Sequence, residues 1–219
     1  MTIMARRTGG AGLLLSAAWA GLYYQGRTWG STREERARFL PGDELVEHPA
    51  ILSNHAITID APPEKIWPWL IQMGWHRGGF YTYRWVDRLL FHDNDPSAER
   101  ILDEYQDLKV GDHVPDGRPE TGCYYVVEIL EPNKMMVLRS WTHLPPQLRD
   151  NPRYRIEWTW AFYLDQVGED ETRLMFRMRG KLEPWWFTAM FQLLVVPADF
   201  VMARSMCLGL KRRAEQLIQ

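Results

Sequence analysis

Cysteine is scarce in this chain, and the clustered cysteine motifs that would assign a metal chemistry are missing. The 219 residues include only Cys123 and Cys207, and no CxxC pair occurs. A disulfide framework and a structural zinc site are therefore disfavoured. We expect no metal site and no cofactor. Two buried free thiols are the expected state, although the sequence leaves a single disulfide between them open.

Charge of one sign is also lacking. The chain carries 26 basic and 28 acidic residues, a formal net charge of −2, and it has no long basic run. Nucleic acid is therefore not expected as a partner, because such binding depends on a clustered positive surface. Motifs for nucleophilic catalysis are missing too, since there is no Gly-x-Ser-x-Gly sequence. The catalytic residues, if any exist, are unknown from the sequence.

Histidines occur but do not form a recognisable site. His55, His76, His113 and His143 are scattered along the chain. The default role of each is structural or solvent-exposed, and one that lies near a cavity would serve as a general base. The run 92–95, His-Asp-Asn-Asp before Pro96, has ligand-type side chains. No fourth ligand lies at helical or hairpin spacing, so a capped turn is the favoured interpretation.

Apolar residues are abundant. Hydrophobic residues make up 46% of the chain and aromatic residues 13%, with 11 tryptophans, which predicts a large aromatic-lined core or cavity. Near the N-terminus, residues 8–24 carry no charge and follow two arginines. This run is marginally short for a membrane span, and Ala18-Trp19-Ala20 resembles a signal-peptidase site. An anchor or signal is favoured over a helix that packs on the domain.

Three regions are expected along the chain. Residues 1–26 form the hydrophobic N-terminal segment, 27–50 a polar connector, and 51–219 a globular domain. In the connector, Ser31 is the expected cap of a short helix, with Glu34 three residues later. In the domain, Ile57 and Ile59 alternate with small or polar residues, as in a half-buried strand. Two prolines and a glutamate then begin a helix, in which Pro68 predicts either a kink or a first turn that is not α-helical.

The middle of the domain alternates short helices with strands. Short helices are expected at 85–91 and 97–105, and strands at 109–114, 123–130, 135–141, 155–164 and 172–179. In the strand 155–164, Ile156, Trp158, Trp160, Phe162 and Leu164 face one way. If the hairpin that follows is symmetric, Glu157 lies near Arg179 across the two strands.

The C-terminal part is helical. Residues 184–196 are nearly all apolar, and Pro197 is expected to interrupt the helix. After it, an apolar stripe follows a helical period and includes three small side chains, Ala203, Cys207 and Ala214. Small residues opposite a strand of tryptophan and phenylalanine favour a cavity between helix and sheet over a filled core.

This order of elements, with its motifs, resembles the SRPBCC superfamily, which includes START domains, pollen-allergen-like proteins and polyketide cyclase/dehydrase proteins. The resemblance covers residues 54–219 and is closest to a bacterial branch with an N-terminal hydrophobic segment. The segments that carry it are residues 57–74, 78–85, 108–112, 160–162 and 199–202. It implies an α+β helix-grip fold, in which a curved antiparallel sheet wraps around a long C-terminal helix. It also implies a cavity for an apolar ligand, but it carries over no catalytic residue set.

Candidate ligand-binding residues come from the aromatic loop, the inner strand face and the helix stripe. Tyrosines combine an apolar body with a polar tip, which suits a mostly apolar ligand. Core packing is the alternative for every one of these aromatic residues. Charged residues inside apolar segments would anchor a polar group if they point inward. The candidates are Trp67, Phe80, Tyr81, Tyr83, Trp85, Asp87, Arg139, Trp158, Trp160, Phe162, Ala203 and Cys207.

Three hypotheses for function follow. The first is a membrane-associated or exported domain that binds or transports a lipid or polyketide-like molecule, with membrane contact through residues 8–24 and 185–196. The second is a cofactor-independent cyclase, dehydratase or isomerase, for which Tyr83, Asp87, His76 and Arg139 are the first residues to test. The third is a structural or partner-binding domain with a filled core. A cytoplasmic location remains if the N-terminal run is not an anchor.

Overall fold

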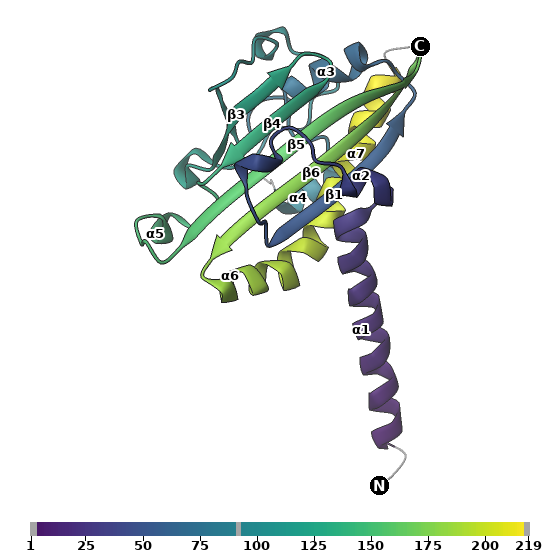
Figure 1. The fold of residues 1–219 in the computed structure, drawn as a ribbon, viewed down its shortest axis with the longest axis vertical. Coiled ribbons are helices and arrows are strands. Elements are labelled where there is room, and N and C mark those ends of the chain that lie inside the picture. The colour runs from purple at the N-terminus through teal and green to yellow at the C-terminus, as the bar shows by residue number, and fades with distance from the viewer. Residues whose placement is uncertain (1–3, 91–92, 217–219) are drawn as a thin grey trace.

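The computed structural model describes the backbone of residues 4–90 and 93–216. Its centre is one six-stranded antiparallel sheet with the order β1-β6-β5-β4-β3-β2. The long helix at the C-terminus packs on one face of this sheet (Figure 1). The architecture is α+β and is the predicted helix-grip fold. The strands are β1 (Ile51–Ile59), β2 (His113–Pro115), β3 (Tyr124–Glu131), β4 (Met135–Ser140), β5 (Arg155–Gly168) and β6 (Glu171–Glu183).

Helices and short turns connect these strands. The α-helices are α1 (Met4–Thr28), α2 (Arg33–Ala37), α3 (Pro63–Ile71), α4 (Arg84–Leu90), α5 (Pro146–Arg149), α6 (Trp185–Met190) and α7 (Val196–Gln216). Single 3-10 turns lie at Asp43–Leu45, Asp103–Tyr105 and Pro119–Thr121. Helix α3 begins at Pro63 and continues through Pro68. The expected helix at 97–105 is wrong, because this segment bonds to the glycine loop instead of to itself: Ala98 N donates to the Gly78 carbonyl.

Two local predictions are wrong by small shifts. The cap of α2 is Thr32, not Ser31: its hydroxyl accepts from Glu35 N, and the Glu35 carboxylate accepts from Thr32 N. In the β5–β6 hairpin, Glu157 lies opposite Lys181, not Arg179. The chain turns at Glu169 and Asp170, later than the prediction assumed, so the pairs from Arg155 to Gln166 are displaced by two residues from the expected register.

The outer face of the sheet is covered by residues 31–46. Leu40 packs there with Ala161, Tyr163 and Met175 in a second apolar cluster. Arg177 of β6 is buried and donates to the carboxylate of Asp43 at 2.6 Å. The connector therefore covers the middle of β5 and β6 on the outer face, and this part of the two strands is buried on both faces. The boundary at residue 51 remains a prediction.

The C-terminal helix is not interrupted at Pro197. Residues Trp185–Gln216 form one helix with a π-helical turn at Phe191–Val195. Proline has no N–H, so the Leu193 carbonyl four residues earlier lacks its usual partner. The indole N–H of Trp19 in α1 donates to this carbonyl at 3.2 Å. Gly26 allows close packing nearby, since a Cβ there would lie 2.9 Å from the Val196 carbonyl oxygen. These contacts fix the direction in which α1 leaves the body in Figure 1.

Candidate functional site

Packed aromatic rings fill much of the inner face of the sheet. Trp158, Trp160 and Phe162 are all buried there, as β5 alternation predicts. The ring centroid of Phe176 lies 4.8 Å from that of Phe162 and 5.5 Å from that of Trp160. Ala203 and Cys207 of α7 are buried in the same core cluster, and burial raises the pKa of the Cys207 thiol to about 12.

The expected cavity between sheet and helix is not where the main pockets lie. In the described part of the chain, none of these pockets is lined by Phe162, Ala203 or Cys207. The small side chains of α7 therefore face a core that is largely occupied by rings. Whether these residues contact a ligand remains a prediction.

The aromatic loop divides between the core and the surface. Phe80 and Tyr81 are buried, as is Trp67 of α3, whereas Tyr83 and Trp85 are exposed. The Tyr81 hydroxyl donates to the Trp69 carbonyl at 2.7 Å, and burial raises its pKa above the usual value. These contacts make Tyr81 a structural link between the loop and α3.

Tyr83 and Asp87 share a polar pocket of about 580 Å³ between the aromatic loop and the end of α7. Thr82 donates a short hydrogen bond to the Asp87 carboxylate, and burial raises the pKa of Asp87. Arg213 contributes a guanidinium that pairs with Glu99 at 2.9 Å. The lining carries the guanidinium groups of Arg84, Arg212 and Arg213 against the two carboxylates of Asp87 and Glu99, so cations are in slight excess.

The other charged and histidine candidates do not join these residues. Arg139 lies on the outer face near Glu128 and Glu157, with contacts of 4.0 and 3.9 Å. His76 is exposed and pairs with Asp95. His55 is buried against the Gly26 carbonyl, and burial lowers its pKa. Of the run 92–95, His92 lies outside the described residues, and among the described residues no group of three metal-ligating side chains occurs.

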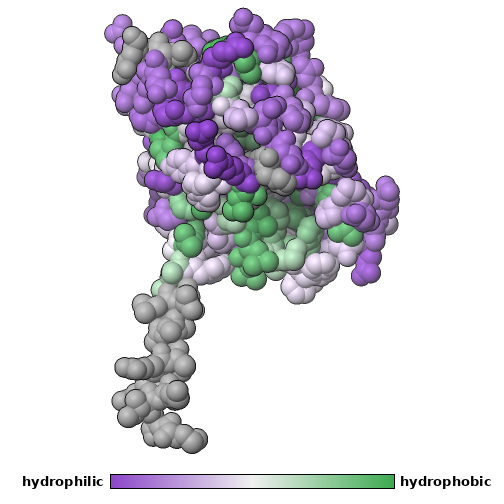
Figure 2. Space-filling model, turned by 180° about the vertical axis from the view of Figure 1, so that it is seen from behind, coloured by the Kyte–Doolittle hydropathy of each residue, from purple (hydrophilic) through white to green (hydrophobic). Residues whose placement is uncertain are grey.

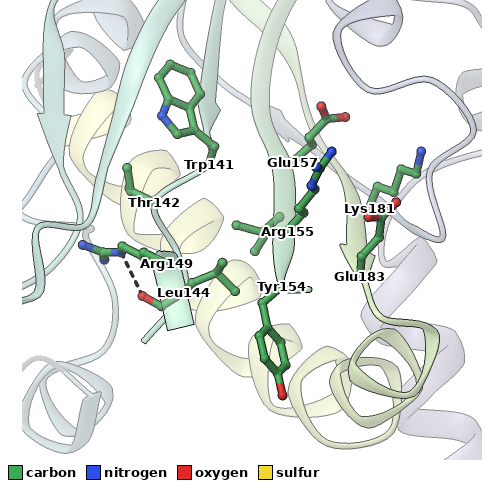
Figure 3. Close-up of a pocket in the computed structure, with 10 residues that line it drawn as sticks. Trp141, Thr142, Leu144, Arg149, Tyr154, Arg155, Glu157, Lys181 and Glu183 are labelled. Carbon is green, nitrogen blue, oxygen red and sulfur yellow. Dashed lines mark hydrogen bonds between the residues drawn. The ribbon is translucent and has the colours of Figure 1, made fainter. Parts of the chain in front are cut away.

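A pocket of about 570 Å³ lies beneath residues 141–154, which leave β4 and return to β5 (Figure 3). Leu144 and Ile156 contribute apolar surface, and charged side chains of β5 and β6 form the rim. The Arg149 guanidinium donates to the Leu144 carbonyl at 3.1 Å and holds the loop in shape. We call this space the loop pocket. Its lining residues are Trp141, Thr142, Leu144, Arg149, Tyr154, Arg155, Ile156, Glu157, Lys181 and Glu183.

A partly buried polar cluster that the sequence did not reveal adjoins the loop pocket. The His143 ring contacts Asp116 Oδ2 through Nε2 and Ser140 Oγ through Nδ1, both at 2.7 Å. Its ring centroid lies 4.7 Å from that of Tyr125, which stacks on Trp160. Thr142 connects this cluster to the loop pocket, because it lines the pocket and contacts Ser140 Oγ at 3.0 Å.

Asp199 of α7 belongs electrostatically to the same cluster. Desolvation and the nearby Asp116 carboxylate raise its pKa to about 7. The residue is only half-buried, so part of its surface remains accessible although its carboxyl is surrounded by protein. No sequence signal joins these groups, because Asp116, Tyr125, His143 and Asp199 lie in different elements at irregular spacings.

An apolar surface lies beside the loop pocket, where α1 leaves the body. Figure 2 shows hydrophobic side chains gathered at this end of the molecule. Trp185 is 80% exposed and Leu194 66% exposed, far more than core residues. The ring of Tyr154, which lines the loop pocket, packs edge-on against the Trp186 ring, with 6.0 Å between the ring centroids. This contact joins the pocket to the apolar surface. We define the apolar patch as Trp185, Trp186, Met190, Leu193, Leu194, Val195 and Val201 of the C-terminal helix, with Trp19, Leu22 and Tyr24 of α1.

One helix in the described part of the chain is long and apolar enough to cross a membrane by length and composition, namely Trp185–Gln216. Its second half packs in the core through Met206, Cys207 and Leu210. Its first half carries the exposed residues of the apolar patch. This division is typical of a core helix whose beginning lies at the protein surface.

Solved structures that are similar to this chain include the following three. A protein of Mesorhizobium loti, MLL2253, matches 76% of this chain and 98% of its own at 16% identity, with a TM-score of 0.43. A norcoclaurine synthase point mutant from Thalictrum, solved with a transition-state analogue, matches 74% of this chain and 95% of its own. The two chains are 12% identical, and the TM-score is 0.40. The Aha1 dimer from Colwellia psychrerythraea matches 71% of this chain and 93% of its own at 20% identity, with a TM-score of 0.36.

No family model matches the sequence, and a search of curated proteins finds no match. The antiparallel sheet and the C-terminal helix that packs on it make the chain a helix-grip α+β protein. Identities and TM-scores this low carry no argument about function.

Proposed function

We propose that this protein binds an apolar small molecule in the loop pocket while α1 and the apolar patch contact a membrane. The observation that carries the proposal is the junction between pocket and patch: Tyr154 lines the pocket, and its ring contacts Trp186 and Phe187 of α6. A lipid or polyketide-like molecule would reach the pocket from the apolar surface without crossing bulk water.

The size and lining of the loop pocket support small-molecule binding. Its volume of about 570 Å³ falls within the roughly 300–1,000 Å³ of typical ligand sites. Apolar surface from Leu144 and Ile156 would hold the body of the ligand. The charged rim would keep a polar end in water.

The apolar patch supports membrane contact. Exposed apolar surfaces of this kind mark interaction sites, and tryptophan favours the membrane boundary. Helix α1 has 25 residues and at 1.5 Å per residue extends about 37 Å. It leaves the body beside the patch (Figure 1), so a bilayer that holds residues 8–24 would meet residues 185–196.

Ligand binding is tested by native mass spectrometry of the full chain purified from its host. The wild-type protein is expected to retain an apolar molecule, and Ile156→Asp is expected to lose it because a charge enters the pocket wall. Val110→Asp is the control, since Val110 is exposed and does not line the pocket. Equal ligand content in the wild type and Ile156→Asp, or no ligand in either, would contradict the proposal.

Membrane contact is tested by spin labelling in lipid nanodiscs. A nitroxide on Leu194→Cys is expected to be relaxed more by oxygen, which partitions into lipid, than by a water-soluble nickel chelate. A label on Val167→Cys in the β5–β6 turn is expected to show the reverse, since this exposed position lies outside the patch. If the labels at both positions are relaxed more by the nickel chelate than by oxygen, membrane contact through the patch is refuted.

A further inference from the structure

The first residues of β5 form an open edge of the sheet inside the loop pocket. Strand β4 ends at Ser140, which lies opposite Trp158 in the register, whereas β5 begins earlier, at Arg155. On its other side this part of β5 is paired with β6. Residues 155–157 therefore have a neighbouring strand on one side only, and all of them line the loop pocket.

Ile156 is the residue whose backbone points to the open side. In an antiparallel sheet, the N–H and C=O of successive residues point alternately to the two neighbouring strands. Leu164 N donates to the Lys134 carbonyl, at the beginning of β4, at 2.7 Å. Even-numbered residues of β5 therefore face β4, because the β4–β5 and β5–β6 registers run without a break from 156 to 164. Ile156 thus points its N–H and its carbonyl to the place that a longer β4 would occupy.

The residue that would continue β4 opposite Ile156 is Thr142, but its backbone bonds elsewhere. Thr142 N donates to Ser140 Oγ at 3.0 Å, and the Thr142 carbonyl accepts from Cys123 Sγ at 3.5 Å. His143 holds this turn, because its ring contacts Ser140 Oγ at 2.7 Å. The chain therefore leaves the sheet at this point and forms the loop pocket instead of pairing with β5.

Both backbone groups of Ile156 lack a hydrogen-bond partner among the residues that the structure describes. The residue is nevertheless only 4% exposed. Buried backbone groups are almost always paired, and an unpaired one is costly. Because Ile156 lines the loop pocket, a ligand there that supplies both a donor and an acceptor would pair both groups.

The geometry of the missing pair defines the polar part of such a ligand. When two residues exchange hydrogen bonds in an antiparallel sheet, each donates its N–H to the carbonyl of the other. A partner for Ile156 must therefore carry an N–H and a C=O on either side of one carbon atom, as an amino-acid residue does. A longer peptide strand would find no further partners, since Trp158 pairs with Ser140 and Tyr154 N donates to the Asn151 carbonyl.

The charges of the loop pocket favour an acid at the polar end of the ligand. The lining contains three cations and two carboxylates, namely Arg149, Arg155, Lys181, Glu157 and Glu183. In the β5–β6 register each carboxylate lies opposite a cation of the other strand, which leaves Arg149 over. Its guanidinium donates to the Leu144 carbonyl and to Cys123 Sγ, and no carboxylate of the described residues pairs with it. A ligand carboxylate would supply the missing negative charge.

We propose that the loop pocket binds an N-acylated amino acid, which pairs with Ile156 in the manner of one residue of a neighbouring strand. This inference rests on the proposed function and names its ligand class. The amide N–H of the ligand donates to the Ile156 carbonyl, and the ligand carboxylate accepts from the Ile156 N–H. The acyl chain packs on Leu144 and Tyr154, whose ring leads to Trp186 of the apolar patch.

The test compares three probes of equal chain length on the full chain in lipid nanodiscs. They are N-decanoylglycine, its ester analogue decanoyloxyacetic acid, and tridecanoic acid. The ester keeps the acyl chain and the carboxylate but replaces the N–H with an oxygen, which the Ile156 carbonyl cannot bind. N-decanoylglycine is expected to bind about tenfold more tightly than the ester, in the upper range for one hydrogen bond. Calorimetric titration measures the affinities, with empty nanodiscs as the reference for partition into lipid.

Two variants and a local measurement locate the pairing at Ile156. Ile156→Pro removes the N–H that binds the ligand carboxylate, and proline is tolerated because this N–H lies outside the ladder. It is expected to bind N-decanoylglycine about tenfold more weakly, whereas Ile156→Val, which keeps the backbone, binds within twofold of the wild type. Independently of either variant, hydrogen exchange of residues 154–158 in the wild type is expected to slow when N-decanoylglycine binds.

The outcomes separate this pairing from ligand binding in general. Equal affinities for N-decanoylglycine and its ester analogue, or unchanged exchange of residues 154–158, overturn the pairing with Ile156, and tridecanoic acid that still binds then leaves the proposed function standing. If none of the three probes binds, the ligand class is overturned. The proposed function itself fails only if native mass spectrometry finds no retained apolar ligand.

Discussion

His143 Nε2 lies 2.7 Å from Asp116 Oδ2, and this contact ties the wall of the loop pocket to the segment that follows β2. Both side chains are largely buried, with exposures of 21% and 13%. His76 and Asp95 form a pair of the same type at 2.9 Å, but with exposures of 52% and 72%. The two pairs therefore offer a matched comparison between a buried and an exposed contact.

Asp116→Asn is expected to lower the free energy of unfolding by about 2 kcal/mol, because a charged hydrogen bond in a buried site is lost. Asp95→Asn, at the exposed pair, is expected to cost less than about 0.5 kcal/mol. Urea denaturation of both variants near neutral pH measures the difference. Equal effects of the two substitutions would show that the buried pair does not hold the loop.

The stability of the protein is expected to fall as Asp199 ionises. Its pKa in the folded state is about 7, above the ordinary carboxyl value of about 4, so the folded protein binds this proton more tightly than the unfolded chain. The contribution is complete below pH ~4 and is lost as pH rises toward 7. Asp199→Asn is expected to be more stable than the wild type by on the order of 2 kcal/mol above pH 7, with no such advantage at pH ~4. Thermal unfolding across this range measures it, and a difference that is independent of pH would contradict the assignment.

Gly209→Ala is expected to destabilise the contact between α7 and the aromatic loop. A Cβ at this position would lie 1.8 Å from the Tyr81 carbonyl oxygen, so backbone must move. Overpacking of this kind costs about 1–3 kcal/mol. Gly21→Ala in α1 is the control, since nothing lies within 4 Å of its Cβ position. Calorimetry of both variants measures the effect, and an unchanged transition in Gly209→Ala would show that α7 and the loop are not in close contact.

Asp43→Asn is expected to release residues 31–46 from the outer face of the sheet. Asp43 accepts from Arg177 and from Leu40 N, and it pairs with Arg179. Removal of its charge leaves the buried Arg177 guanidinium without a counter-charge, with only the Asn54 side chain and the carbonyls of Arg38 and Glu35 as acceptors, which costs about 3 kcal/mol or more. Hydrogen exchange of residues 31–46 is expected to rise sharply. Asp165→Asn, which breaks the exposed pair with Arg38, is expected to change it little, and equal protection in the two variants would argue against the role of Asp43.

Local signals in the sequence predicted most of the secondary structure. The alternation of residues 155–164 predicted which side chains of β5 face the core, and these side chains are buried. Errors occurred where the backbone found partners outside its own segment. Residues 97–105 bond to the glycine loop, and the helix break expected at Pro197 is absent because a π-helical turn precedes it and Trp19 binds the freed carbonyl.

The candidate site was predicted less well, because its residues meet only in three dimensions. The aromatic loop contributes some residues to the core and others to the surface, a division that composition does not reveal. The cluster of Asp116, Tyr125, His143 and Asp199 is spread over some 80 residues and four elements. No period of helix or strand relates these positions, so no pattern in one sequence predicts their contact.

The sequence by itself determined the inner strand face, the apolar stripe of α7 and the uncharged N-terminal run. These depend on periods of two and 3.6 residues and on runs of apolar side chains, which are local properties of the chain. The helix-grip fold was implied by the resemblance of the sequence to a known superfamily. Tertiary structure alone decided where space remains. Aromatic rings occupy the inner face that was expected to hold a cavity, while the loop pocket opens beneath residues 141–154. Packing volumes and charge pairs depend on residues distant in sequence, so only the folded chain shows them.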